Sequence, residues 1–258
     1  MTAPPADGAV RTARDGAVLT VTLDRPDRLN AQTPATWAAL AEVGRSLDDD
    51  VRVVVVRGAG RSFSAGLDRS LFSTDPDVPG GLGELAGMPA ELAQERIRGY
   101  QSGFRWLRQP GIVSIAAVQG HAIGAGAQLA LACDLRVVTE DAELRLPEAG
   151  LGLVPDLTGT SNLVQLVGYA RALEICLTGR EVHAGEAVRT GLATVAVPAA
   201  ELDEAVADLV AAITSAPVGA SRETAELVRA AVRNSPEEQD EAERAAQARR
   251  LAALARGD

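Results

Sequence analysis

One stretch, residues 113–138, constrains this chain more than any other; it reads VSIAAVQGHAIGAGAQLALACDLRVV. Its first six residues are apolar or small and rich in β-branched side chains, which is typical of a buried strand. Gly120, Gly124 and Gly126 follow, and residues 128–133 then have the composition of a helix. Glycines permit close backbone approach, and the first amides of a helix lack internal partners. The stretch therefore predicts a strand, a tight turn and a helix start that can bind an electron-rich atom.

A second unit of the same kind precedes it. Residues 51–56 (VRVVVV) are apolar almost without alternation, which indicates a strand buried on both faces among parallel neighbours. The loop GAGRSFSAGLD follows, and we expect a helix to begin within 67–72. Two such turns could converge on one carbonyl oxygen as an oxyanion hole. Tight packing alone is one alternative; a dinucleotide fingerprint is another, although Leu129 stands where its last Gly or Ala belongs.

The remaining elements alternate between strands and helices, which favours an α/β core with a helical C-terminal appendage. Strands are expected at 17–23, 134–139, 142–146 and the end of 178–197. Helices are expected at 33–47, 91–107, 161–177, 202–214, 221–233 and in the charged tail from 235. The segment 73–90 is rich in proline and glycine and is expected to be mobile.

Composition excludes several classes of protein. With 258 residues and 47% hydrophobic content, the chain can form one large domain or a domain with an appendage. It has no apolar run of membrane-spanning length, and residues 1–8 look like a loose leader without a signal-peptide core, so we expect a cytoplasmic protein. The net charge of −10 argues against nucleic-acid binding. All 25 basic residues are arginine, which excludes lysine Schiff-base chemistry and a P-loop.

Two acidic residues, Glu148 and Asp156, lie in the irregular segment PEAGLGLVPD. A carboxyl group in an apolar pocket has a raised pKa and can move protons near neutral pH. Solvated loop carboxylates are the alternative.

The other residues with reactive side chains are expected to be structural. No metal-ligand spacing is present, and no GxSxG hydrolase elbow surrounds the serine. Two buried thiols suggest a reducing compartment. These residues are His121, His183, Ser64, Cys133 and Cys176.

Five motifs together resemble the enoyl-CoA hydratase/isomerase (crotonase) family over roughly residues 15–200. They are LDRPDRLNA (23–31), RSFSAGLD (61–68), VQGHAIGAGAQLALACDLRV (118–137), LPEAGLGLVPDLTG (146–159) and TGREVHAGEAVRTGLA (178–193). The resemblance implies a crotonase (ClpP-like) spiral of ββα units over 1–200, which holds a CoA thioester in a bent shape. It also implies a helical region, 201–258, that builds homotrimers, usually paired as hexamers.

By position, the resemblance assigns the oxyanion hole to the backbone amides of Leu67 and Ala125. Ala125 replaces a common glycine, but the donor is backbone, so the function survives if the conformation does. Gly124, Gly126 and Gln128 are then expected to line the pocket, with Gln128 positioning a water.

The acid–base positions depart from the hydratases of the family. Glu148 matches the second of their two glutamates, whereas Gln128 replaces the first and cannot transfer a proton. Asp156 matches the second carboxylate of the dienoyl-CoA isomerases. We therefore expect Glu148 and Asp156 to shift a double bond without adding water. The alternatives are hydration with Glu148 alone, another CoA-thioester reaction, and acyl-CoA binding without turnover.

The resemblance also implies where CoA is bound. The residues expected near its adenine and phosphates are Arg25, Arg28, Arg61, Ala65 and Asp68. No metal and no separate cofactor are expected, because coenzyme A is part of the substrate. The tail beyond residue 235 lacks the family's usual aromatic-containing segment.

Overall fold

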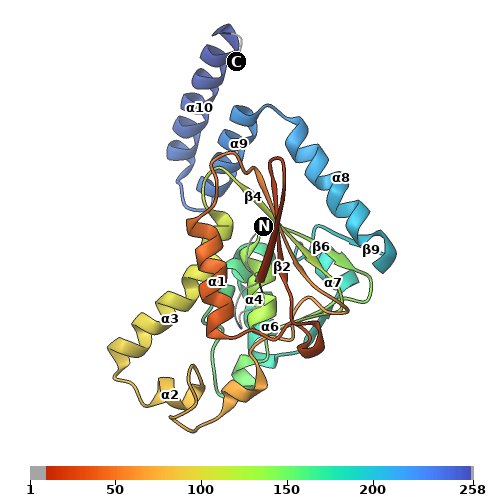
Figure 1. The fold of residues 1–258 in the computed structure, drawn as a ribbon. Coiled ribbons are helices and arrows are strands. Elements are labelled where there is room, and N and C mark those ends of the chain that lie inside the picture. Colours follow the sequence, from red (N-terminus) through yellow and green to blue (C-terminus); the bar gives the residue numbers. More distant parts are fainter. Residues whose placement is uncertain (1–9, 257–258) are drawn as a thin grey trace.

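The computed structural model describes residues 10–256, and Figure 1 shows a twisted sheet with helices on both sides. The main sheet has six strands in the order β1-β2-β3-β4-β6-β9. Its first two strands are antiparallel and every other neighbouring pair is parallel. A smaller sheet has the order β5-β7-β8. The α/β architecture and the parallel neighbours of the valine-rich strand are as predicted.

The strands are β1 Val10–Asp15, β2 Val18–Leu23, β3 Val53–Gly58, β4 Val113–Val118, β5 His121–Ile123, β6 Leu135–Thr139, β7 Glu143–Arg145, β8 Glu181–His183 and β9 Val195–Val197. The α-helices are α1 Pro34–Arg45, α2 Leu82–Ala86, α3 Ala90–Arg105, α4 Ala125–Ala132, α5 Gly159–Val167, α6 Tyr169–Thr178, α7 Ala184–Arg189, α8 Leu202–Ser215, α9 Val218–Ala230 and α10 Pro236–Arg256.

The centre of the sheet is buried on both faces, because β3 carries apolar residues without alternation. Val54 and Val56 of β3 belong to the main core, which also includes α1, α3 and α4. Val53 and Val55 face the opposite way and pack with Leu202 of α8 and its neighbours. The predicted boundary at residue 200 therefore falls just before a helix that packs against the sheet of its own chain.

Two helix predictions differ from the structure. The helix expected over 161–177 is two helices, α5 and α6, because Gly168 between them has φ +77°. The helix expected within 67–72 is only a short 3-10 helix, Arg69–Phe72. In contrast, α4 begins at Ala125, three residues before the predicted start, so this amide is the first of the helix.

The segment 73–90 is less irregular than its composition suggests. It contains α2, and Gly83 donates its amide hydrogen to the carbonyl oxygen of Ser73 at 2.9 Å, which ties the helix to the preceding loop. The strand β1 was not predicted, because only Val10 of its six residues is buried. The expected loose leader, 1–8, lies outside the described residues.

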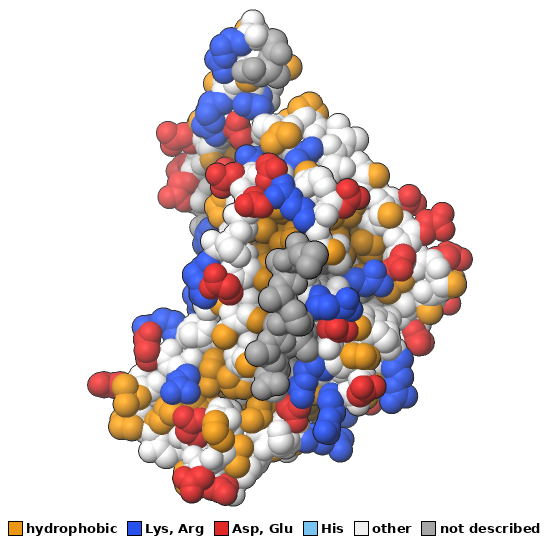
Figure 2. Space-filling view, viewed as in Figure 1, with side chains coloured by type: hydrophobic (Ala, Val, Ile, Leu, Met, Phe, Trp, Pro, Cys, Tyr) orange, Lys and Arg blue, Asp and Glu red, His pale blue; other side chains and the backbone are white. Residues whose placement is uncertain are grey.

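The helix α9 is tied to the core, since its Arg229 pairs with Asp134 at 2.8 Å, whereas α10 projects from the body of the molecule in Figure 1. Acidic and basic side chains are interspersed on the face shown in Figure 2, including the projecting end of α10. Within residues 10–256, no helix combines the length and the apolar character that a membrane crossing requires.

Candidate active site

The two glycine-rich turns lie side by side. Ser64 donates its amide hydrogen to the carbonyl oxygen of His121 at 2.9 Å, and Ile123 donates to that of Ser64 at 3.0 Å. A Cβ atom on Gly126 would lie 2.5 Å from the Ser64 carbonyl oxygen, and one on Gly66 would lie 2.5 Å from that of Ile123. Glycine is therefore required at both positions for the turns to approach this closely.

The amides of Leu67 and Ala125 are unpaired within the described part of the chain. Gln32 accepts the amide hydrogen of Asp68 at 2.8 Å and donates its own to Gly66 at 2.7 Å, which leaves the Leu67 amide facing the other way. Ala125 is the first residue of α4, so its amide has no partner in the helix. A Cβ on Gly66 would lie 3.6 Å from the Ala125 nitrogen, so the two turns bring these donors close together.

Glu148 is a buried carboxyl group beside the second of these turns. Its side chain is 8% exposed, and its Oε1 would lie 3.5 Å from a Cβ on Gly124. Oε1 accepts a hydrogen bond from Gln128 Nε2 at 2.9 Å, whereas Oε2 is buried and has no partner among residues 10–256. Burial raises the pKa of the Glu148 carboxyl, and the charge of Asp156 raises it further. Glu148 is thus a carboxylate with one fixed and one uncommitted oxygen.

Gln128 determines which oxygen of Glu148 is uncommitted. Its Oε1 accepts from the backbone amides of Leu157 at 2.8 Å and Gly159 at 3.2 Å, so its NH₂ group must face Glu148. A Cβ on Gly159 would lie 2.6 Å from Gln128 Cγ, so this contact requires glycine. Gln128 is 1% exposed, and its carboxamide contacts protein groups at both ends; the expectation that it positions a water stays a prediction.

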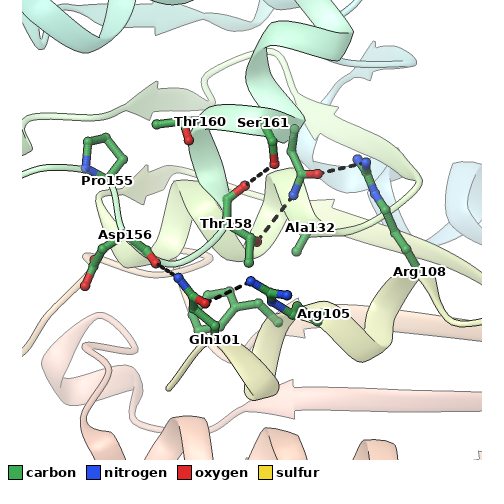
Figure 3. Close-up of a pocket in the computed structure, with 11 residues that line it drawn as sticks. Gln101, Arg105, Arg108, Ala132, Pro155, Asp156, Thr158, Thr160 and Ser161 are labelled. Atoms are coloured by element: carbon green, nitrogen blue, oxygen red, sulfur yellow. Dashed lines mark hydrogen bonds between the residues drawn. The ribbon is translucent and has the colours of Figure 1, made fainter. Parts of the chain in front are cut away.

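Asp156 lies on the segment that Gln128 holds. Its backbone oxygen accepts from Gln101 Nε2 at 2.7 Å, and burial raises the pKa of its half-buried carboxyl. Figure 3 shows this side chain extending away from Arg105 and Arg108. The structure therefore brings Glu148 and Asp156 close enough for the charge of one to shift the pKa of the other.

The loops expected to bind CoA are joined to each other. Arg25 forms an ion pair with Asp68 at 2.9 Å and donates to the carbonyl oxygen of Ala31 at 2.6 Å. Ala65 donates its amide hydrogen to the carbonyl oxygen of Leu29 at 2.8 Å. These contacts commit the Arg25 guanidinium to the protein.

Arg28 and Arg61 differ from Arg25, because both are exposed and neither has a side-chain partner within 10–256. Of the three arginines, these two are therefore the ones with guanidinium groups available to a ligand.

Of the five residues expected to be structural, Ser64 and Cys133 are fully buried, whereas His121 and His183 are exposed. Ser64 is buried, and its hydroxyl donates to the Asn30 carbonyl oxygen at 2.8 Å while accepting from Gln32 at 3.0 Å. Burial raises the pKa of the Cys133 thiol to about 12. Cys176 is only half-buried, so the expectation of two buried thiols is wrong for this residue.

Three residues that hold the site were not predicted. Gln32 and Gln101 carry no local signal, because each binds backbone atoms far away in the sequence. Gly159 lies in the motif LPEAGLGLVPDLTG, and a glycine at the start of a helix could have indicated the close contact with Gln128.

Comparison with known proteins places this geometry in context. A family model described as enoyl-CoA hydratase/isomerase matches residues 13–254. The "Probable enoyl-CoA hydratase echA12" of Mycobacterium bovis is 40% identical over 216 residues, which cover 81% of this chain and 71% of that protein. The peroxisomal "Delta(3,5)-Delta(2,4)-dienoyl-CoA isomerase" of Arabidopsis thaliana is 33% identical over 185 residues, covering 71% and 66% respectively.

A solved structure matches nearly the whole fold. It is a protein assigned as an enoyl-CoA hydratase from Thermobifida fusca YX, in complex with acetoacetyl-CoA. It is 46% identical, with a TM-score of 0.90 over 97% of this chain and 99% of that one.

Proposed function

The chain belongs to the enoyl-CoA hydratase/isomerase family, and we propose that it shifts a double bond along the acyl chain of an enoyl- or dienoyl-CoA thioester. The observation that carries this proposal is the state of Glu148, with Oε1 held by Gln128 and Oε2 buried and uncommitted. A single oxygen of raised basicity, beside two free backbone amides, suits the removal of a proton next to a thioester carbonyl.

The first step uses the backbone donors. The amides of Leu67 and Ala125 donate to the thioester oxygen, and this stabilises the negative charge that develops there when the α-carbon loses a proton. Removing one such donor typically costs about 3–4 kcal/mol of transition-state stabilisation. Glu148 Oε2 takes the α-proton, which leaves a thioester enolate or, from a dienoyl chain, an extended dienolate.

The second step returns a proton further along the chain. Asp156 starts protonated and donates to the γ-carbon of a 3-enoyl chain, or to the ε-carbon of a 3,5-dienoyl chain. Glu148 ends protonated and Asp156 ends ionised, so exchange with solvent restores both. The pKa values of both carboxyl groups are raised by burial, and this supports proton exchange nearer neutral pH than free carboxyl groups allow.

Gln128 argues against efficient hydration. Activation of water by two groups requires a second proton acceptor, and a carboxamide cannot serve as one. Both ends of Gln128 are also committed to Leu157, Gly159 and Glu148. Hydration with Glu148 as sole base remains the second candidate, because a relative 40% identical to the chain bears the name enoyl-CoA hydratase.

Three substrates distinguish these reactions. Purified protein is mixed with 2-enoyl-, 3-enoyl- or 3,5-dienoyl-CoA, and conjugated absorbance and product mass are followed. The proposal expects conjugation to increase from the 3-enoyl or 3,5-dienoyl substrate at unchanged mass. A product heavier by one water from the 2-enoyl substrate, with no shift of the others, would replace it by hydration. Binding of all three without conversion would contradict catalysis.

We further propose that the C-terminal helices build a homotrimer or a hexamer. Five large apolar side chains on and just beyond α9 and on α10 are exposed, namely Val218, Val228, Val232, Leu251 and Leu254. A group of exposed apolar side chains on neighbouring helices is typical of an interface between subunits. Light scattering of the purified chain tests this: a monomer at micromolar concentration would contradict it.

A further inference from the structure

A cavity borders the segment that carries Asp156 (Figure 3). It has a volume of about 450 Å³, which is within the range of roughly 300–1,000 Å³ typical of small-molecule sites. It lies between the end of α3, the end of α4 and the first turn of α5. Its polar lining residues are Gln101, Arg105, Arg108, Asp156, Thr158, Thr160, Ser161 and Asn162.

The lining consists mostly of hydrogen-bond donors. Two guanidinium groups, three hydroxyl groups and two carboxamides face one carboxyl-bearing residue, Asp156. The Asp156 side chain extends away from both arginines in Figure 3, and no ion pair joins it to either of them. The cavity is therefore locally positive in a chain whose net charge is −10.

The charge of Arg108 is not neutralised by a carboxylate of its own. Its terminal NH groups already donate to neutral oxygens of the protein, to Asn162 Oδ1 at 2.9 Å, Gln165 Oε1 at 3.4 Å, and the carbonyl oxygens of Leu131 at 2.9 Å and Cys133 at 3.3 Å. Its Nε is buried and has no partner among the described residues. The nearby Asp134 is paired with Arg229 at 2.8 Å. Burial lowers the pKa of Arg108, and the charge of Asp134 acts in the opposite direction.

Arg105 provides a second, exposed cation at the cavity. Its guanidinium donates only to the neutral oxygen of Gln101, at 2.9 Å, and forms no ion pair within residues 10–256. Arginine recognises carboxylates and phosphates through its planar array of N–H groups. An oxyanion in the cavity would neutralise both arginines and could accept hydrogen bonds from the hydroxyls beside them.

We propose that this cavity is a binding site for a small oxyanion, a carboxylate or a phosphate, which Arg105 binds by hydrogen bonds and which the charge of Arg108 attracts from behind. Two sources can supply it. One is a free small anion. The other is a carboxylate at the far end of the acyl chain, since Asp156 borders both the proposed acyl path and the cavity; this source alone rests on the proposed function.

Direct binding of inorganic phosphate and of malonate tests the site. Calorimetric titration of the full chain is expected to give saturable binding that Arg108→Gln and Arg105→Gln each weaken about tenfold, the loss typical of one charge-assisted contact. Arg98→Gln is the matched control, because Arg98 is an exposed arginine of the same helix that pairs with Glu95. The control variant should bind both anions as the natural chain does.

A second arm distinguishes the two sources. Binding of succinyl-CoA, which carries a terminal carboxylate, is compared with binding of butyryl-CoA in the same variants. A carboxylate on the acyl chain predicts that Arg105→Gln and Arg108→Gln weaken succinyl-CoA about tenfold and leave butyryl-CoA unchanged. A free anion predicts unchanged binding of both thioesters, with weakened binding of phosphate or malonate.

The site is overturned if neither anion binds saturably and both thioesters bind equally in all variants. It is also overturned if Arg98→Gln weakens anion binding as much as the two cavity variants do. Arg108 supports backbone carbonyls, so if its variant does not fold, the exposed Arg105 decides the outcome. Failure here with butyryl-CoA binding intact leaves the proposed enzymatic function standing.

Discussion

The two sides of segment 155–159 differ in how completely their polar groups are paired. On the Glu148 side, both ends of the Gln128 carboxamide bind protein groups, and one oxygen of Glu148, Oε2, has no partner among the described residues. On the Arg108 side, cations and hydroxyl groups border an open cavity with no carboxylate bound to the cavity arginines. The proposed roles follow this difference: one defined proton transfer on the first side, and binding of small anions on the second.

The same backbone connects both sides. Gln128 binds the amides of Leu157 and Gly159 from one side, and Gln101 binds the carbonyl oxygen of Asp156 from the other. Hydrogen bonds to the backbone fix the segment without using the Asp156 side chain. The position of Asp156 is thus set by neutral carboxamides, and its carboxyl group stays available for chemistry.

The largest effect is expected from Glu148→Gln, which replaces the proposed base on the Glu148 side of segment 155–159 with a carboxamide. Loss of a general base typically lowers the rate about 10²–10⁴-fold. Steady-state isomerisation of 3-enoyl-CoA measures it, with the exposed Glu140→Gln as control. A decrease of less than tenfold would mean that Glu148 is not the base.

Asp156→Asn tests whether the proton returns from the segment between the two sides. The variant should lose isomerisation by about 10²-fold or more, because asparagine cannot donate a proton to carbon. Acyl-CoA affinity should change little. The exposed Asp141→Asn serves as control, and near-normal turnover of the Asp156 variant would exclude its role.

Gly159→Ala tests the contact with Gln128, on the Glu148 side of the segment, without altering a polar group. The new methyl group would meet the Gln128 side chain, so we expect activity to fall about 10²-fold and the free energy of unfolding to fall about 1–3 kcal/mol. Gly150→Ala is the matched control, because a Cβ there has open space and no positive φ. Equal effects of the two substitutions would show that the Gln128 contact is unimportant.

The smallest effect is a pH shift in Gln128→Glu. A second carboxylate beside Glu148 disfavours its ionised form, so the pKa of the base rises and the acidic limb of the kcat/KM profile moves to higher pH, by about one unit or more. Gln94→Glu, on the exposed side of α3, should leave the profile in place. An unshifted or lowered limb in Gln128→Glu would contradict the contact.

Much of the fold could be predicted from the sequence. The valine-rich strand β3 was evident because burial on both faces removes alternation, and α8 followed from apolar periodicity. The break at Gly168 was not, because the apolar pattern LVGYARALEI continues through it. The edge strand β1 carries too few apolar residues to give a signal.

Part of the candidate site could likewise be predicted from the sequence, and part could not. The glycine-rich turns, Glu148 and Asp156 were assigned from motifs, because motifs record local spacing. The contacts of Gln128 with residues 157 and 159 join backbone groups about thirty positions away, and no pattern encodes them. The cavity could not be predicted from the sequence either, because Arg108 binds Asn162, which lies 54 positions away on another helix.

The central claim is that Glu148 and Asp156 move protons and no water is added. Turnover of 3-enoyl-CoA in deuterium oxide, with the product analysed by NMR and mass spectrometry, tests it most directly. The account predicts a 2-enoyl-CoA that carries deuterium at the γ-carbon and no hydroxyl group, and no such deuterium with Asp156→Asn. A 3-hydroxyacyl-CoA that carries deuterium at the α-carbon as the main product would contradict it.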